Sequence, residues 1–221
     1  MTFMEPIVLS VFVAAAASVI VYVSAVSFAF FFIREAIPLK WLWETLFMLP
    51  IVLSPTVIGF LLVKLFGRTG VVGTFLYEWF HISPMFTITA AVMAASVVAF
   101  PLMYQAAKAG FQAVPESYVE VTKQYTNNPI DVLRYTYIPS ARYGLIAGYT
   151  LSFARGLGEF GATFMFAGNI PGVTVTMPTA VYTAFEKGED ITAWIYVTIS
   201  IVISALFLYV VTYAEKRKHA A

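Results

Sequence analysis

Long apolar runs and short polar intervals alternate along this chain. Residues 7–33, 41–65, 84–107 and 191–213 form runs long enough for the roughly 20 residues with which a helix crosses a bilayer. A fifth run begins near Arg142 and continues until the chain becomes irregular at residues 167–172. The next apolar piece, residues 173–185, is short and favours a half-helix or re-entrant segment. The pattern predicts an all-α integral membrane domain spanning residues 1–221, with five spans and a possible sixth short or re-entrant helix.

Small residues and prolines add detail to these runs. Pro50 and Pro55 should kink the second run, which membranes tolerate when neighbouring helices satisfy the freed carbonyls. Residues 67–83 predict a polar loop with aromatic residues suited to an interface. Gly144 and Gly148 form a small-x3-small pair that favours helix contact. Closely spaced alanines in the third run favour tight packing in the same way: Ala90, Ala91, Ala94 and Ala95.

The longest polar interval runs from Pro115 to Pro139, and its pattern predicts two short helices joined by a turn. Ser117 and Glu120 have the spacing of a capping box at the start of the first helix. Asn128 followed by Pro129 predicts the start of the second helix, with Asn128 as its N-cap.

The second of these helices is amphipathic. Ile130, Leu133 and Tyr137 recur at helical spacing and form an apolar stripe that the segment cannot bury within itself. Pro139 should end the helix. Such a stripe predicts that the interval docks into a groove elsewhere.

Composition confirms the membrane class and excludes several functions. Hydrophobic residues make up 60% of the chain and charged residues 11%, whereas about a quarter of residues are charged in soluble domains. A net charge of +1 gives no basic face for nucleic acid. The chain has no cysteine, and its two histidines, His81 and His219, lack metal-ligand spacing. No nucleophile–base pair or metal motif points to an enzyme.

The basic residues predict an orientation, because short cytoplasmic loops retain Lys and Arg. With five spans and an external N-terminus, nine basic residues lie inside and three outside. This topology places the interval 115–139 and the C-terminus in the cytoplasm. A sixth full span at residues 173–185 would separate the two, and the charge bias disfavours it. The inner residues are Arg34, Lys40, Lys108, Lys123, Arg134, Arg142, Lys216, Arg217 and Lys218, and the outer ones are Lys64, Arg68 and Lys187.

At this point two segments carry a resemblance to a known family. The interval resembles the cytoplasmic loop of ABC-transporter permeases, with Glu120 and Pro139 at the spacing of its Glu-Ala-Ala…Gly…Ile-x-Leu-Pro pattern. The chain departs from that pattern at Val121, Thr122, Thr126, Thr136 and Ile138. The segment FARGLGEFGATFMFAGNIPGVTVTMPTAVY, residues 153–182, closely resembles the molybdate permease subfamily. Sulfate permeases rank second, because they usually carry Tyr and Ser where this chain has Phe160 and Ala162.

The resemblance implies the transmembrane domain of a type I ABC importer in the cytoplasmic (inner) membrane of a prokaryote. This chain would form the oxyanion pathway as a homodimer, with two cytoplasmic ABC ATPase subunits and an extracytoplasmic oxyanion-binding protein. Molybdate or tungstate is the implied substrate, and sulfate or thiosulfate is the alternative. The chain has no G-x-x-x-x-G-K-[ST] loop. We therefore expect this chain to bind no cofactor, and ATP and Mg²⁺ to be used by the ATPase subunits.

By the same resemblance, the interval is a coupling loop that seats in a groove of each ATPase. Glu120 has two competing roles there, as a helix-capping residue and as part of the docking surface. The predicted docking residues are Ser117, Tyr118, Glu120, Val121, Thr122, Thr126, Asn127, Asn128, Pro129, Ile130 and Leu133.

Arg155 and Glu159 are spaced to pair on one face of the fifth run, and ionisable residues within a span are functional candidates. One hypothesis places Arg155 in the oxyanion path, with Glu159 tempering its charge. The other is an intrahelical ion pair that only braces packing. Neutral donors that could line an outer gate are Thr163, Asn169, Thr174 and Thr176.

A carrier driven by an ion gradient is the remaining class of transporter. It would normally show an internal repeat and several acids within the spans, whereas Glu159 is the single central acid here. The sequence shows no dedicated oxyanion-binding site, so it does not predict which of molybdate, tungstate and sulfate is selected.

Overall fold

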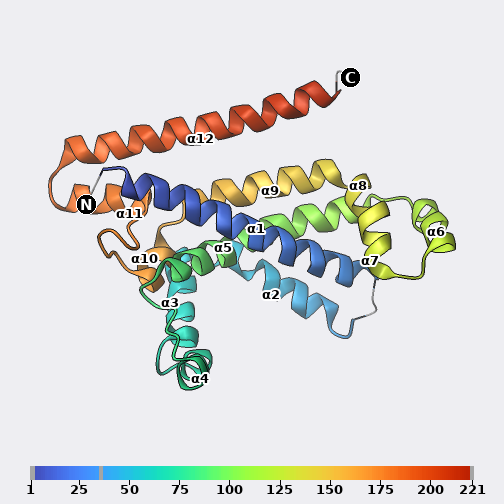
Figure 1. The fold of residues 1–221 in the computed structure, drawn as a ribbon, viewed down its shortest axis with the longest axis horizontal. Coiled ribbons are helices and arrows are strands. Elements are labelled where there is room, and N and C mark those ends of the chain that lie inside the picture. Colours follow the sequence, from blue (N-terminus) through green and yellow to red (C-terminus); the bar gives the residue numbers. More distant parts are fainter. Residues whose placement is uncertain (1–2, 35–36, 220–221) are drawn as a thin grey trace.

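The computed structural model describes residues 3–34 and 37–219, except the side chains of residues 212–219. The basic side chains of Lys216, Arg217 and Lys218 therefore lie outside the described part. Within it the chain is helical (Figure 1). The elements are α1 (Glu5–Arg34), α2 (Lys40–Val52), α3 (Pro55–Phe66), α4 (Val71–Phe80), α5 (Ile88–Gln112), α6 (Glu116–Tyr125), α7 (Pro129–Val132), the π-helix η1 (Leu133–Tyr137), α8 (Ile138–Ser140), α9 (Arg142–Leu157), α10 (Gly161–Ala167), α11 (Met177–Glu186) and α12 (Asp190–His219).

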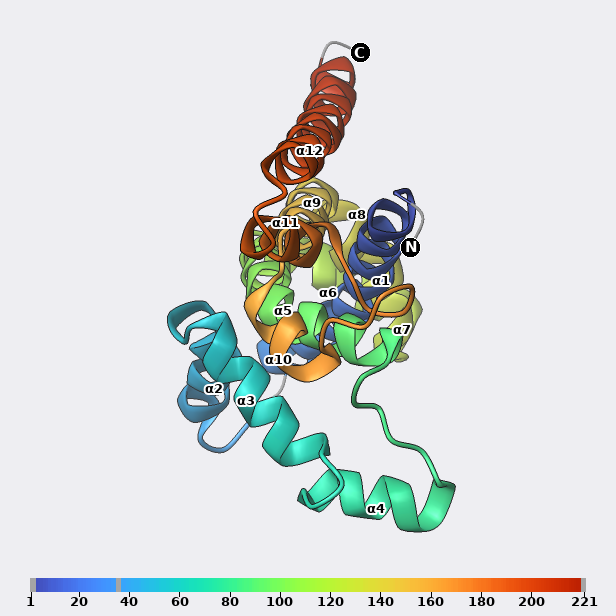
Figure 2. The ribbon, with the colours of Figure 1, turned by 90° about the vertical axis from the view of Figure 1, so that its left-hand side faces the viewer.

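The centre of the molecule is a bundle of α1, α5 and α9, whose axes run side by side in Figures 1 and 2. Small residues let these helices approach closely, as the sequence predicted. A Cβ atom on Gly148 of α9 would lie 2.6 Å from the Ala106 Cβ of α5. The four predicted alanines of α5 are fully buried: Ala90, Ala91, Ala94 and Ala95. The interface depends on short side chains and backbone contact.

The second apolar run is broken into α2 and α3, whose axes differ by 119°. The break falls at Leu53 and Ser54, where the Ser54 hydroxyl accepts a hydrogen bond from the Val57 N–H at 3.4 Å and Pro55 begins α3. Pro50, by contrast, lies inside α2. The predicted interruption is therefore confirmed at Pro55, which follows the extended N-cap residue Ser54, whereas α2 continues through Pro50 without a break.

Residues 67–83 contain a helix, so the prediction of a loop there was incomplete. Gly67 and Gly70 end α3 and begin α4, and the glycines suggested a loop because they interrupt the apolar pattern. α4 packs chiefly on α3, and together they extend away from the bundle as an arm (Figure 2).

The two ends of the bundle carry different elements (Figure 1). α6 to α8 and the C-terminus of α12 lie at one end, whereas the N-terminus, α10 and α11 lie at the other. α1, α5 and α12 are long and apolar enough to cross a membrane, and the bent pair α2–α3 is a fourth candidate. α9, with 16 residues, runs beside α1 and α5 as the remaining predicted span. The short helix expected at residues 173–185 is α11, with 10 residues.

Candidate functional site

The polar interval forms a compact helical elbow at one end of the bundle. α6 begins at Glu116, with Pro115 at its N-cap and no side-chain hydrogen bond there. The capping box predicted for Ser117 and Glu120 is therefore wrong, since both residues lie inside the helix. Pro115 has extended backbone geometry and a side chain without a hydrogen-bond acceptor, so the start of α6 has no side-chain cap. Glu120 is exposed and has no capping role.

The second helix begins as predicted. The Asn128 Oδ1 accepts a hydrogen bond from the Ile130 N–H at 3.0 Å, and Pro129 occupies the first helical position. The Thr126 hydroxyl donates to the Asp131 carboxylate at 2.9 Å and accepts from the Asn128 N–H at 3.1 Å. These bonds connect the end of α6 to the start of α7.

Pro139 does not end the helix, which corrects the prediction. The chain passes through η1, where the Ile138 N–H reaches the Leu133 carbonyl, and continues into α8 with Pro139 at its start. A proline inside an α-helix clashes with the carbonyl four residues earlier. The wider π turn that precedes Pro139 is consistent with relief of that clash, and π turns recur at functional sites.

The predicted apolar stripe is divided between two surfaces. Leu133 and Tyr137 pack on the bundle, where the Tyr137 ring lies 5.4 Å from Phe30 of α1 and 5.3 Å from Phe111 of α5. Burial raises the pKa of the Tyr137 hydroxyl above its ordinary value. Ile130 alone of the three is exposed. The expectation that the whole stripe needs an external groove was wrong, because α1 and α5 bury most of it.

Further contacts join α6 to the rest of the elbow. The Thr122 and Thr136 hydroxyls share a hydrogen bond of 2.6 Å, and Val119 and Val132 are buried. An outward-facing apolar patch remains, which we call the elbow patch. It comprises Tyr118, Val121, Tyr125 and Ile130. Five other predicted docking residues are also exposed, namely Ser117, Glu120, Asn127, Asn128 and Pro129, whereas Thr122, Thr126 and Leu133 are partly buried.

The ion pair predicted in the fifth run is present, in a different setting. The Arg155 Nη1 lies 2.7 Å from the Glu159 Oε2, but α9 ends at Leu157. Glu159 therefore lies in the bend between α9 and α10, and the pair is not intrahelical. The other Glu159 oxygen accepts a hydrogen bond from the Ala162 N–H at 2.9 Å. The Glu159 side chain is 2% exposed and that of Arg155 33%.

The helix that follows the pair is held by close backbone approach. A Cβ atom on Gly161 would lie 3.0 Å from the Pro55 Cβ, and one on Gly59 would lie 2.9 Å from the Ala162 Cα. α10 consequently packs on α3 next to the break after α2. Arg155 and Glu159 thus join the end of α9 to a contact between α10 and α3, where movement of either helix would disturb the charged pair.

Three of the four predicted gate residues, Asn169, Thr174 and Thr176, lie in the loop between α10 and α11. The Thr174 hydroxyl accepts from the Ile170 N–H at 2.9 Å and donates to the Gly168 carbonyl at 3.3 Å. Gly168 has a φ of 74°, a value that favours glycine. The Asn169 amide donates to Thr183 of α11 at 2.8 Å.

Thr163 and Thr176 are buried as well, at 1% and 4% exposure. The structure therefore brings Asn169, Thr174 and Thr176 together in one loop, and it places Thr163 separately within α10. Within this chain the Thr174 hydroxyl bonds the loop's own backbone.

Two polar contacts escaped the sequence prediction. The buried Ser10 hydroxyl of α1 accepts a hydrogen bond from the Met177 N–H at 2.7 Å, which anchors the start of α11. Lys108 of α5 donates to Glu44 of α2 at 2.7 Å. Lys108 was predicted to lie in a loop, because its charge suggested that the helix ended at Ala107. The signal for both contacts was a lone polar residue in an apolar run.

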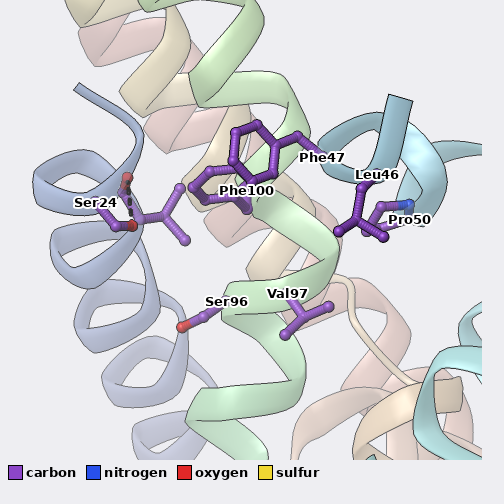
Figure 3. Close-up of a pocket in the computed structure, with 8 residues that line it drawn as sticks. Ser24, Leu46, Phe47, Pro50, Ser96, Val97 and Phe100 are labelled. Carbon is purple, nitrogen blue, oxygen red and sulfur yellow. Dashed lines mark hydrogen bonds between the residues drawn. The ribbon is translucent and has the colours of Figure 1, made fainter. Parts of the chain in front are cut away.

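A cavity of about 260 Å³ between α1, α2 and α5 is a less suitable place for an oxyanion (Figure 3). Its two polar residues, Ser24 and Ser96, donate to carbonyls of their own helices at 2.7 Å. The remaining wall is hydrocarbon. It is formed by Val21, Leu46, Phe47, Pro50, Val97 and Phe100.

Comparison with known proteins now places the chain. Residues 7–220 match the family described as "Binding-protein-dependent transport system inner membrane component". The chain belongs to this family. It is consequently a multi-pass membrane permease component, as the helical bundle and the resemblance in residues 115–182 indicated.

Within this family the chain is similar to several molybdenum permeases. It is 43% identical to YvgM of Bacillus subtilis, provisionally named a molybdenum transport system permease protein, over 98% of this chain and 95% of that one. It is 40% identical to the molybdenum transport system permease protein ModB of Escherichia coli over 72% and 69% of the two chains. The ModB of Haemophilus influenzae is 36% identical over 76% and 74%.

Proposed function

We propose that this chain forms the transmembrane pathway of an ATP-driven importer of molybdate, with tungstate as a second substrate. The observation that carries the proposal is the similarity to proteins named molybdenum transport permeases, which extends over 98% of the chain for YvgM. In this proposal two copies form the pathway at their interface. A separate ABC ATPase hydrolyses ATP with Mg²⁺, and an extracytoplasmic binding protein delivers the oxyanion.

The elbow is the proposed docking site for the ATPase, on the cytoplasmic side. The elbow patch offers exposed apolar side chains, and exposed aromatic residues are typical anchors in protein interfaces. Tyr137 and Leu133 hold the elbow against α1 and α5, so a displacement of the patch would be passed to the bundle. This rigid attachment supports coupling by movement rather than by covalent chemistry.

Arg155 is the proposed oxyanion-facing residue. The carboxylate of its partner Glu159 is buried and accepts a hydrogen bond from a backbone N–H of α10. The Arg155 side chain is therefore the more exposed member of the pair. Partial neutralisation by Glu159 would weaken anion binding enough for the ion to leave again. The threonines and Asn169 of the loop between α10 and α11 are the proposed outer gate.

Uptake measurements in vesicles that contain the reconstituted complex test the proposal. We expect labelled molybdate to accumulate in the vesicles with ATP and not with ADP. This uptake should persist when ionophores collapse the proton and sodium gradients. Molybdate should also stimulate ATP hydrolysis more than sulfate does. Loss of uptake with the ionophores would indicate an ion-gradient carrier. Stimulation by sulfate alone would indicate a sulfate permease.

A Glu120→Ala variant tests the docking surface. Because Glu120 is exposed and caps no helix, the free energy of unfolding should change by less than about 0.5 kcal/mol. The amount of ATPase that co-purifies with the permease should nevertheless fall. Glu116→Ala, which removes an exposed acid from the same helix, is the matched control. Equal retention of the ATPase by both variants would contradict a docking role for Glu120.

A further inference from the structure

The arm formed by α3 and α4 carries an exposed apolar surface that the proposed transport function does not use. Val71, Phe75 and Trp79 lie four residues apart on one face of α4 and are 84%, 53% and 72% exposed. Thr74 and Glu78 border this face on one side, because Glu78 follows Phe75 by three residues and Thr74 by four. Gly73 is buried where α4 meets α3. Among the described residues, α4 therefore presents an exposed, mainly apolar surface with a polar edge at Thr74 and Glu78.

The orientation of α4 relative to the bundle restricts what can cover this face. In Figure 2 the bundle is seen end-on, and α4 lies across the view, crosswise to the bundle. If α1 and α5 cross the bilayer, α4 runs parallel to the membrane plane. Residues 81–87 connect it to the start of α5, and Figure 1 shows α4 beside the end of the bundle at which α5 begins.

The cations near the junction of α3 and α4 indicate a lipid surface. Lys64 lies 5.5 Å from the centre of the Phe60 ring, and Arg68 lies 5.3 Å from that of Tyr77. Cationic and aromatic side chains together are typical of the headgroup region, where amphipathic rings and basic groups meet anionic lipids.

We propose that α4 is an interfacial helix, with Val71, Phe75 and Trp79 inserted among lipid acyl chains and Lys64 and Arg68 at the headgroups. The arm then braces α3 against the bilayer. Because α3 also packs on α10, the membrane surface is linked mechanically to the bend that contains Glu159. The proposal holds for either leaflet and does not depend on the transported ion.

The absence of native cysteine allows a direct test with spin labels on single cysteines. The full chain would be reconstituted in vesicles of phosphatidylethanolamine and phosphatidylglycerol. Labels at Phe75→Cys and Trp79→Cys should collide severalfold more often with oxygen, relative to an aqueous nickel chelate, than the control label at Glu78→Cys. The arm is exposed at all three positions, so the substitutions should not prevent folding.

Two results would overturn the proposal. Preferential access of the nickel chelate to positions 75 and 79 would indicate an arm in water. Protection from both reagents, with spin–spin broadening, would indicate that a second copy covers the face.

A variant with Lys64→Gln and Arg68→Gln gives a further readout. It should reduce the depth of both labels in these vesicles and leave it unchanged in phosphatidylcholine alone. Since no ATPase or oxyanion is present, failure here leaves the transport proposal untouched.

Discussion

Replacing Arg155 by Gln is expected to abolish molybdate uptake and to destabilise the permease by about 3–5 kcal/mol, because it leaves a buried charge without its partner. Glu159 is 2% exposed, and its ion pair with Arg155 spans 2.7 Å. The single substitution therefore combines two effects, loss of the proposed oxyanion-facing charge and loss of a structural contact. Uptake in vesicles and thermal unfolding followed by tryptophan fluorescence measure them separately.

The double variant Arg155→Gln with Glu159→Gln separates the two roles. The neutral amide that replaces the Glu159 carboxylate can still accept the hydrogen bond from the Ala162 N–H, so stability and co-purification of the ATPase should largely recover. Uptake should remain absent if Arg155 faces the oxyanion. Recovery of uptake together with stability would instead assign the pair a packing role alone.

The second large effect is expected at the contact between α5 and α9. Gly148→Ala would place a Cβ atom 2.6 Å from the Ala106 Cβ and 3.0 Å from the Met103 sulfur. Overpacking of this kind costs about 1–3 kcal/mol, more than the roughly 1 kcal/mol that alanine gains over glycine in a helix. We expect a lower temperature of unfolding in detergent and a lower yield of folded permease.

Gly144 provides the matched control on the same helix. A Cβ atom there would meet the Ala106 carbonyl at 3.5 Å and the Gly110 Cα at 3.6 Å, which are ordinary contact distances. Gly144→Ala should therefore keep or slightly raise the unfolding temperature. A lowered temperature for Gly144→Ala, or an unchanged one for Gly148→Ala, would contradict the close approach of α5 and α9 at Gly148.

The sequence predicted the helical class and the positions of the main helices well, because a spanning helix must satisfy its backbone internally and be apolar over its length. Local capping was predictable only where no stronger constraint competed. Asn128 caps α7 as expected, whereas Pro115 moved the start of α6 and removed the cap predicted for Ser117. The π turn before Pro139 was not predicted, because the spacing of apolar residues does not distinguish a single π turn from a turn of α-helix.

The candidate site was predicted in part. The spacing of Arg155 and Glu159 was sufficient to predict that they pair, since residues four apart are neighbours in a helical turn. The sequence did not predict that Glu159 lies beyond the end of α9, or that its carboxylate accepts a hydrogen bond from the Ala162 N–H at the start of α10. A glycine-rich segment can continue a helix or bend it, and the choice depends on the helices against which it packs.

By itself, then, the sequence determined that this is an all-helical membrane protein, which of its segments are apolar enough to cross, and which short residues allow close packing. Only the tertiary structure decided that Leu133 and Tyr137 are buried against α1 and α5, that α3 turns away from α2 by 119°, and that Lys108 meets Glu44. The physical reason is the distance along the chain over which each effect acts. Hydropathy and helix periodicity act over one segment, whereas burial of a side chain depends on what distant segments bring beside it.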